Sequence, residues 1–246
     1  MCFSNITTLE NLVVNIPAEA EIYKLNNLYC YNCIDLVNVD VNLSKIPDIP
    51  YLTIRPYSNI KNMNIDISNC INSNYFEISL CGNVEQFNIN MANTKNINYL
   101  NISSFNLSQD LDINLTSCIN INQLYLYNLK GDNFNNLTIT LNNNITSINR
   151  MLIFGASINN PSDLSYINIK YNGYTNIKMN YISFAYQSKL TDDCFDNLLG
   201  FLANINFTGS VTNKKLSVVF SGCSKTQEYF SALSNYSNLI AKGWTY

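Results

Sequence analysis

A period of 24 residues runs through the middle of the chain and constrains the fold more than any other feature. Residues 24 positions apart form three columns, which run from Val39, Val41 and Leu43 to Asn135, Leu137 and Ile139. Fourteen of the fifteen positions are apolar, and Asn135 is the exception. Polar residues separate the columns, and this alternation with period two predicts a β-strand that buries one face.

A second set of apolar columns lies about halfway round each period. Its members are Leu52, Phe76, Leu100 and Leu124, and then Ile54, Ile78, Ile102 and Leu126. A single coil cannot bury its own apolar face, whereas stacked coils share one continuous core. Two strands per 24-residue coil therefore predict a mainly β fold, which is a parallel β-solenoid or leucine-rich-repeat-like stack.

The repeat loosens towards both ends of the chain. Further strands are expected at 151–154, 167–171 and 179–186, separated by turn residues at 159–163 and 172–173. Upstream, 12–16 and 22–31 are expected to be irregular opening strands. We therefore assign residues 1–189 to the solenoid array.

From Leu190 the period stops, and residues 190–246 are expected to form a small α/β cap on the open end of the array. Thr191 followed by two aspartates predicts a helix start. A short strand at 216–220, a second helix at about 225–242 and a closing strand at 244–246 are expected to follow.

The outward positions of the first strand are rich in Asn and Asp, in a chain that holds 45 Asn. Like residues in stacked parallel coils lie about 4.8 Å apart, so their amides can hydrogen-bond as a ladder. Solvated strand faces and a ligand site are the alternatives to this structural interpretation. The predicted ladder comprises Asn64, Asp66, Asn88, Asn90, Asp112, Asn114 and Asn136.

The outer face of the second strand is rich in tyrosine. Tyrosine has a large amphipathic surface that suits partner or glycan binding, although a tyrosine ladder can also merely cover the solenoid. The candidate binding residues are Tyr51, Tyr75, Tyr99, Tyr125 and Tyr127.

The sequence contains no histidine, which excludes Ser-His-Asp and Cys-His catalysis and most zinc sites. Charged residues make up 13% and the net charge is −3, which disfavours a nucleic-acid surface.

The sequence contains a single CxxC motif, from Cys30 to Cys33, and we expect its two cysteines to be buried free thiols. Cys70 and Cys118 lie two coils apart, at about 10 Å, too far for a disulfide. We expect no cofactor, metal or catalytic residue; the best pair for a carboxylate enzyme is Asp110 with Asp112.

We identify no signal peptide and no stretch of about 18 apolar residues, so neither export nor membrane insertion is expected.

The C-terminal ending resembles that of a known family. A terminal helix leads into residues 241–245, which read AKGWT, and a helix–strand unit ending in Ser221-Gly222 precedes it. This resembles the last segment of leucine-rich-repeat-like proteins of gut Bacteroidales and their tailed phages, in which a similar KGWT ending follows an aliphatic repeat array. Residues 121–129, with leucines at 124, 126 and 129, also look like the leucine-rich-repeat core. The resemblance is good over residues 190–246, whereas the array resembles the family only in its repeat pattern. It implies no catalytic residue.

The resemblance implies a phage virion protein, because the export signal of bacterial surface members is missing here. We therefore expect a non-enzymatic structural or adhesion component, such as a tail fibre, that serves host attachment. Its partners would be other virion proteins, further copies of itself or a host-surface glycan. The alternatives are a carboxylate-based polysaccharide-cleaving enzyme and a bacterial leucine-rich-repeat surface adhesin.

Overall fold

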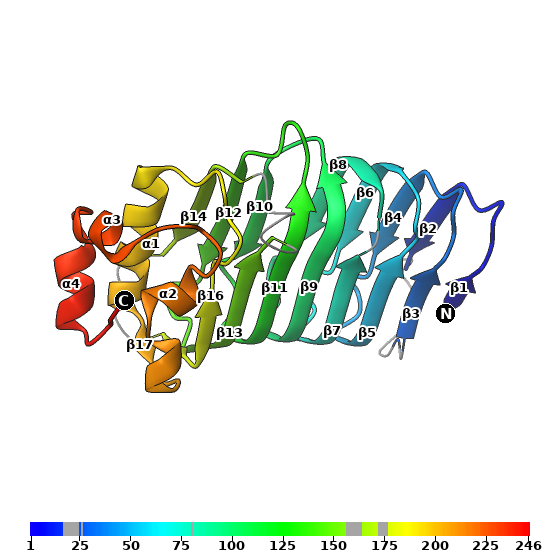
Figure 1. The fold of residues 1–246 in the computed structure, drawn as a ribbon. Helices are drawn as coiled ribbons and strands as arrows, with labels where there is room; N and C mark the ends of the chain where they lie inside the picture. Colours follow the sequence, from blue (N-terminus) through cyan, green and yellow to red (C-terminus); the bar gives the residue numbers. More distant parts are fainter. Residues whose placement is uncertain (17–24, 26, 80, 156–163, 172–176) are drawn as a thin grey trace.

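The computed structural model describes residues 1–16, 25, 27–79, 81–155, 164–171 and 177–246. It confirms a mainly β chain folded as a parallel β-solenoid of about eight turns, with 47% of the described residues in strands and 14% in helices. The two termini lie at opposite ends of the solenoid, and the helices gather at the C-terminal end (Figure 1). The predicted strand 22–31 and turns 159–163 and 172–173 lie partly or wholly outside the described residues. In the part of the chain that is described, no helix is long and apolar enough to cross a membrane.

Each coil contributes one strand to a front sheet and one to a back sheet, as seen in Figure 1. The front sheet contains β1 (Cys2–Ser4), β3 (Asn27–Tyr31), β5 (Asp48–Arg55), β7 (Asn72–Ser79), β9 (Asn96–Leu107), β11 (Asn120–Lys130), β13 (Ser147–Phe154), β15 (Lys178–Met179), β16 (Tyr181–Ser183) and β17 (Asn206–Phe207). The back sheet contains β2 (Asn11–Asn15), β4 (Asn38–Asn42), β6 (Ile60–Asp66), β8 (Asn83–Asn90), β10 (Leu111–Leu115), β12 (Asn136–Leu141) and β14 (Tyr166–Lys170). Its strands form two hydrogen-bonded groups: β2, β4, β6 and β8, which join the front sheet through β9, and a separate group of β10, β12 and β14.

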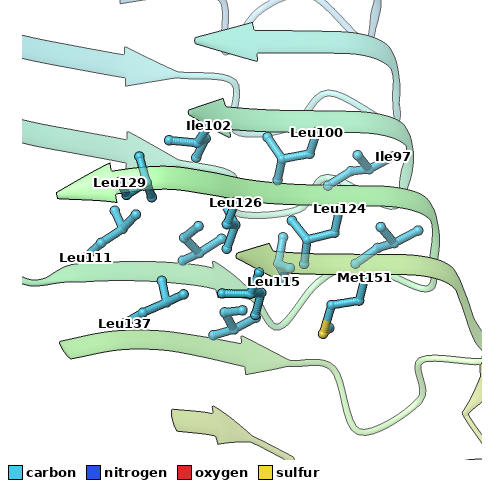
Figure 2. Packing of buried hydrophobic residues seen from close by; sticks show 14 of the residues in the cluster. Ile97, Leu100, Ile102, Leu111, Leu115, Leu124, Leu126, Leu129, Leu137 and Met151 are labelled. Carbon is cyan, nitrogen blue, oxygen red and sulfur yellow. The ribbon is translucent and has the colours of Figure 1, made fainter. Parts of the chain in front are cut away.

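The core lies between the two sheets, and its front half follows the predicted columns. In the parallel register, Phe76 pairs with Leu100, Leu100 with Leu124, and Leu124 with Met151. All four side chains are at most 1% exposed. Figure 2 shows Leu100, Leu124 and Met151 on successive strands, pointing into the same interior. Each apolar side chain is therefore buried mainly by its equivalents in the neighbouring coils.

The back sheet departs from the expected register at its centre. Among the described residues, strand β8 pairs with β6 and with the end of β9, where Val84 lies opposite Leu107, while β10 pairs with β12. Leu111 pairs with Leu137, so the step there is 26 residues, and the predicted pairing of Leu137 with Ile113 was wrong. The turn between β11 and β12 is two residues longer than the turn between β9 and β10. Asn135 accordingly lies exposed in that turn and not in the apolar column.

The C-terminal segment differs from the predicted elements, because one expected strand is a helix and one expected helix is divided into two. Helix α1 (Asp192–Asn204) is confirmed, and the Thr191 side chain caps it by accepting from the Cys194 N–H. The predicted strand 216–220 is instead helix α2 (Leu216–Val219), in which both end residues are buried at helical spacing. An apolar run this short does not distinguish the 3.6-residue period of a helix from the two-residue period of a strand. Residues 211–213 form a 3-10 helix.

The expected long second helix is divided into α3 (Gln227–Ser231) and α4 (Tyr236–Ala241). Asn235 lies at the break, where its backbone N–H donates to the Asp196 carboxylate at 2.7 Å. Because this N–H bonds to α1, it is not used for a helical hydrogen bond, and the helix is interrupted between α3 and α4. The expected closing strand reduces to one bridge between Thr245 and Lys215.

We predict that Leu100→Ala lowers the free energy of unfolding by about 2–5 kcal/mol, because it leaves a cavity in a column that neighbouring coils cannot close. Asn98→Ala is the matched control on the same strand, since Asn98 is exposed and loses only bonds at the surface. It should cost about 0.5–1.5 kcal/mol. Urea denaturation followed by circular dichroism measures both; equal losses would contradict the assignment of the column.

Candidate binding site

Tyrosines form an ordered column on the outer face of the front sheet. Tyr51, Tyr75 and Tyr99 occupy equivalent positions on β5, β7 and β9. The rings of Tyr75 and Tyr99 stack with centroids 4.5 Å apart and planes 7° apart, whereas Tyr51 is tilted by 37° from Tyr75. Asn27 lies opposite Tyr51 on β3, so the column of rings ends there and leaves Tyr51 41% exposed.

The other two predicted tyrosines lie on the same face in neighbouring columns. The ring of Tyr125 contacts that of Tyr99 edge to face at 5.2 Å. Tyr127 stacks on Phe154 of β13 with centroids 5.2 Å apart and planes 14° apart. The fold thus brings all five predicted tyrosines to one face, although in three columns.

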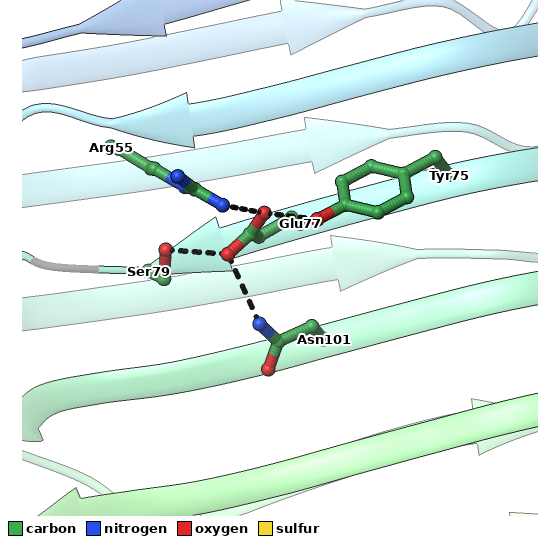
Figure 3. Close-up of polar contacts among 5 residues, drawn as sticks. All are labelled: Arg55, Tyr75, Glu77, Ser79 and Asn101. Carbon is green, nitrogen blue, oxygen red and sulfur yellow. Dashed lines mark hydrogen bonds and ion pairs between the residues drawn. The ribbon is translucent and has the colours of Figure 1, made fainter.

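A buried carboxylate, which the sequence analysis missed, lies beside the tyrosine column. Glu77 projects outwards from β7 and yet is only 4% exposed. Figure 3 shows its carboxylate surrounded by four side chains. One oxygen, Oε2, accepts from Arg55 in an ion pair and from the Tyr75 hydroxyl at 2.7 Å. The other, Oε1, accepts from Ser79 at 2.9 Å and from the Asn101 amide at 3.1 Å.

These bonds determine the charge state of Glu77. Burial of the carboxyl by itself raises the pKa, but the hydrogen bonds from Arg55, Tyr75 and Ser79 outweigh it and hold the pKa below its usual value. Burial and the hydrogen bond to Glu77 raise the pKa of Tyr75, so the phenol remains a donor. The cluster therefore contains a charged pair with no net charge.

A groove of about 510 Å³ opens on this face at the N-terminal end of the solenoid. It crosses β1, β3, β5 and β7, and four of its nine lining residues are tyrosines. It is lined by Cys2, Ser4, Tyr29, Tyr31, Tyr51, Thr53, Arg55, Tyr75 and Glu77. Its volume is in the range of small-molecule sites.

Three polar atoms in or beside the Glu77 cluster lack a hydrogen-bond partner within the part of the chain that is described. They are Arg55 Nε, Asn101 Oδ1 and Ser103 Oγ. Buried polar atoms are normally paired, and an unpaired one costs about 1–3 kcal/mol. Arg55 is the one of the three residues that also lines the groove.

The predicted amide ladder forms in part. Asn88 donates to Asn64 at 2.9 Å across adjacent coils. The Asp66, Asn90 and Asn114 side chains instead accept from backbone N–H groups two residues further along, which stabilises the turns after their strands.

The ladder does not continue as predicted past the shift in register. Asp112 pairs in register with Thr138, and Asn136 instead donates to Asp110 at 2.6 Å. Two longer side-chain ladders lie on the front sheet, and the 24-residue spacing in the sequence could have revealed all of their steps except the last, from Asn122 to Asn149, which is 27 residues. One joins Asp48, Asn72, Asn96 and Asn120, and the other joins Asn74, Asn98, Asn122 and Asn149.

The carboxylates considered for catalysis line a cleft of about 340 Å³ in the back sheet, beside the break between β8 and β10. Asp110 is engaged by the backbone N–H groups of Asn135 and Asn136 and by the Asn136 amide. Desolvation raises its pKa, but these hydrogen bonds together outweigh that effect and lower the pKa. A general acid needs a raised pKa, so this environment favours a structural role for Asp110. Asp112 is exposed.

The cysteines are free thiols, and all but Cys2 are buried. Burial raises the pKa of Cys70 and of Cys118 to about 12, which makes both inert. In the described residues, no group of three or more His, Cys, Asp or Glu side chains could hold a metal ion.

We predict that Glu77→Gln lowers the free energy of unfolding at pH 7 by about 1–3 kcal/mol, because it removes a charge-assisted bond and leaves Arg55 uncompensated. The native pKa of Glu77 lies below the usual value of 4.5, so the unfolded state binds more protons at acid pH. Its stabilisation is present above pH 4.5 and is lost as the pH falls through the native pKa.

The stability difference between the native chain and Glu77→Gln should therefore shrink on acidification, which urea denaturation between pH 7 and pH 3 measures. Glu85→Gln is the control, because Glu85 is exposed on β8. A difference that stays constant with pH would show that the Glu77 carboxylate is not held ionised by its partners.

Comparison of the chain with protein-family models, with curated proteins and with solved structures finds no match.

Proposed function

We propose that this chain is a non-enzymatic adhesion protein that binds a surface glycan through the tyrosine-rich outer face of its front sheet. The observation that carries the proposal is the groove at the end of the tyrosine column, where exposed rings adjoin buried polar groups. Sugars present an apolar C–H face and a hydroxyl edge, and a wall of aromatic rings next to hydrogen-bonding groups complements both.

The rigidity of this face supports recognition. The rings of Tyr75 and Tyr99 hold each other by stacking, and Tyr75 is also tethered to Glu77. Ordering these side chains therefore costs little entropy when a ligand binds. A protein partner could use the same aromatic surface and is an outcome that the experiment below distinguishes.

The arrangement of carboxylates favours binding over cleavage of a glycan. Glu77 is ion-paired and accepts four hydrogen bonds, and Asp110 is held by a turn. Neither environment raises a pKa as a general acid requires. The polysaccharide-cleaving alternative would need a second acid brought opposite one of them.

We expect the native chain to bind at least one polysaccharide in an immobilised panel and to release no oligosaccharide from it. The double variant Tyr51→Ala/Tyr127→Ala should bind about 5- to 150-fold more weakly, since each ring removed forfeits about 0.5–1.5 kcal/mol of contact. Val13→Ala is the control, because Val13 is 66% exposed on β2 of the opposite sheet. Released oligosaccharide would favour the enzyme, and binding to no glycan would favour a protein partner.

Placement in a phage virion, as a fibre or other host-attachment component, is the part of the proposal that rests on the resemblance of the C-terminal ending. The expected partners are neighbouring virion proteins or further copies of the chain. If the proposal is right, the chain co-purifies with infectious particles through a density gradient and is detected there by mass spectrometry. Recovery only with the bacterial envelope would favour the surface-adhesin alternative. Light scattering of the purified chain tests self-association.

A further inference from the structure

We propose that the groove over β1, β3, β5 and β7 is a binding site for a neutral pyranose unit of a polysaccharide. This inference rests on the proposed function and gives it a location and a ligand class. The groove is where the outer face combines exposed aromatic rings, a compensated ion pair and a partly exposed guanidinium.

The walls of the groove suit the apolar face of a sugar ring. Tyr31 and Tyr51 line it from adjacent strands and are 42% and 41% exposed. The equivalents of Tyr51 further along the solenoid, Tyr75 and Tyr99, are stacked on one another and are half-buried, whereas Tyr31 pairs in register with Arg55. Free ring surface is therefore concentrated at this end of the column, where a flat ligand can add to the stack.

The charges in the groove favour a ligand without net charge. Among the described lining residues, Arg55 and Glu77 are the charged ones, and they form an ion pair with each other. Both oxygens of Glu77 already accept from protein groups, which leaves little for a cationic ligand. An anionic sugar would place its charge beside Glu77, and the resulting repulsion would offset its attraction to Arg55.

The polar groups at the groove match hydroxyl oxygens. The Arg55 side chain lines the groove and remains 33% exposed beside its ion pair with Glu77. A guanidinium has donors and no acceptor, so the atom that satisfies it must be an acceptor. Thr53, which lies between Tyr51 and Arg55 on β5, adds a hydroxyl that can donate or accept. A sugar hydroxyl supplies both capacities without bringing a charge.

The exposed thiol of Cys2 offers a direct readout of occupancy. Cys2 lines the groove, whereas the other seven cysteines are buried. We expect saturating mannan, dextran or galactan to slow alkylation of Cys2 by iodoacetamide at least about tenfold in the native chain, measured by mass spectrometry. Polygalacturonate at the same sugar concentration should leave the rate unchanged. Failure of all three neutral polymers to protect Cys2, or equal protection by polygalacturonate, would overturn the proposal.

Variants at Glu77 and Thr53 test whether the groove selects neutral over anionic polymers. A purely structural role for Glu77 would leave that selectivity unchanged. Glu77→Gln leaves Arg55 uncompensated, so binding of the neutral polymer should fall about tenfold and binding of polygalacturonate should appear. Thr53→Val keeps the side-chain shape and provides a second variant should Glu77→Gln fold poorly; it should weaken binding of the neutral polymer without creating affinity for the anionic one. Unchanged binding by both variants would refute the assignment.

A further comparison separates this inference from the proposed function. Tyr51→Ala should abolish protection of Cys2, and Val13→Ala, on the opposite sheet, should preserve it. Polysaccharide binding that survives Tyr51→Ala but is lost in Tyr127→Ala would refute the groove and leave the proposed function standing. A native chain that binds no saccharide would refute both.

Discussion

The lateral stacking of parallel coils is the interaction on which the rest of this structure depends. Backbone hydrogen bonds set neighbouring strands about 4.8 Å apart, so each side chain lies against the residue one coil away. Leu100 is buried by Phe76 and Leu124 for this reason. The same spacing lets Asn96 donate to Asn72 and lets the ring of Tyr75 stack on that of Tyr99. Apolar, amide and aromatic columns are thus three consequences of one register.

The candidate site arises where the columns change composition. Glu77 occupies a position that is Thr53 in the preceding coil and Asn101 in the following one. A carboxylate buried on such a surface is costly unless several groups satisfy it, and those groups come from its own strand and from both neighbours. The groove opens beside this cluster because the ring column ends at Tyr51. A few changes of residue within the repeat therefore create one candidate site on an otherwise regular solenoid surface.

The accuracy of the sequence-based predictions follows the regularity of the repeat. The front columns through Phe76 and Leu100 were predicted correctly, because four equivalent positions reinforce one pattern. The pairing of Leu137 was not, because a turn two residues longer shifts the register without altering the alternation. The helix at 216–219 was missed because four residues carry too little periodicity to distinguish it from a strand. Glu77 was missed because an outward glutamate in a strand ordinarily faces water.

The mainly β solenoid, the inward direction of the apolar columns and the shared face of the five tyrosines could all be predicted before the structure was known. These features follow from a period of 24 combined with an alternation of two, and both are properties of the order of residues along the chain. The folded chain was needed to see that Arg55 and Glu77 pair, that their neighbours bury Glu77, and that a groove lies beside the pair. Those facts depend on which columns are adjacent and where a column ends, and adjacency exists only after the coils have stacked.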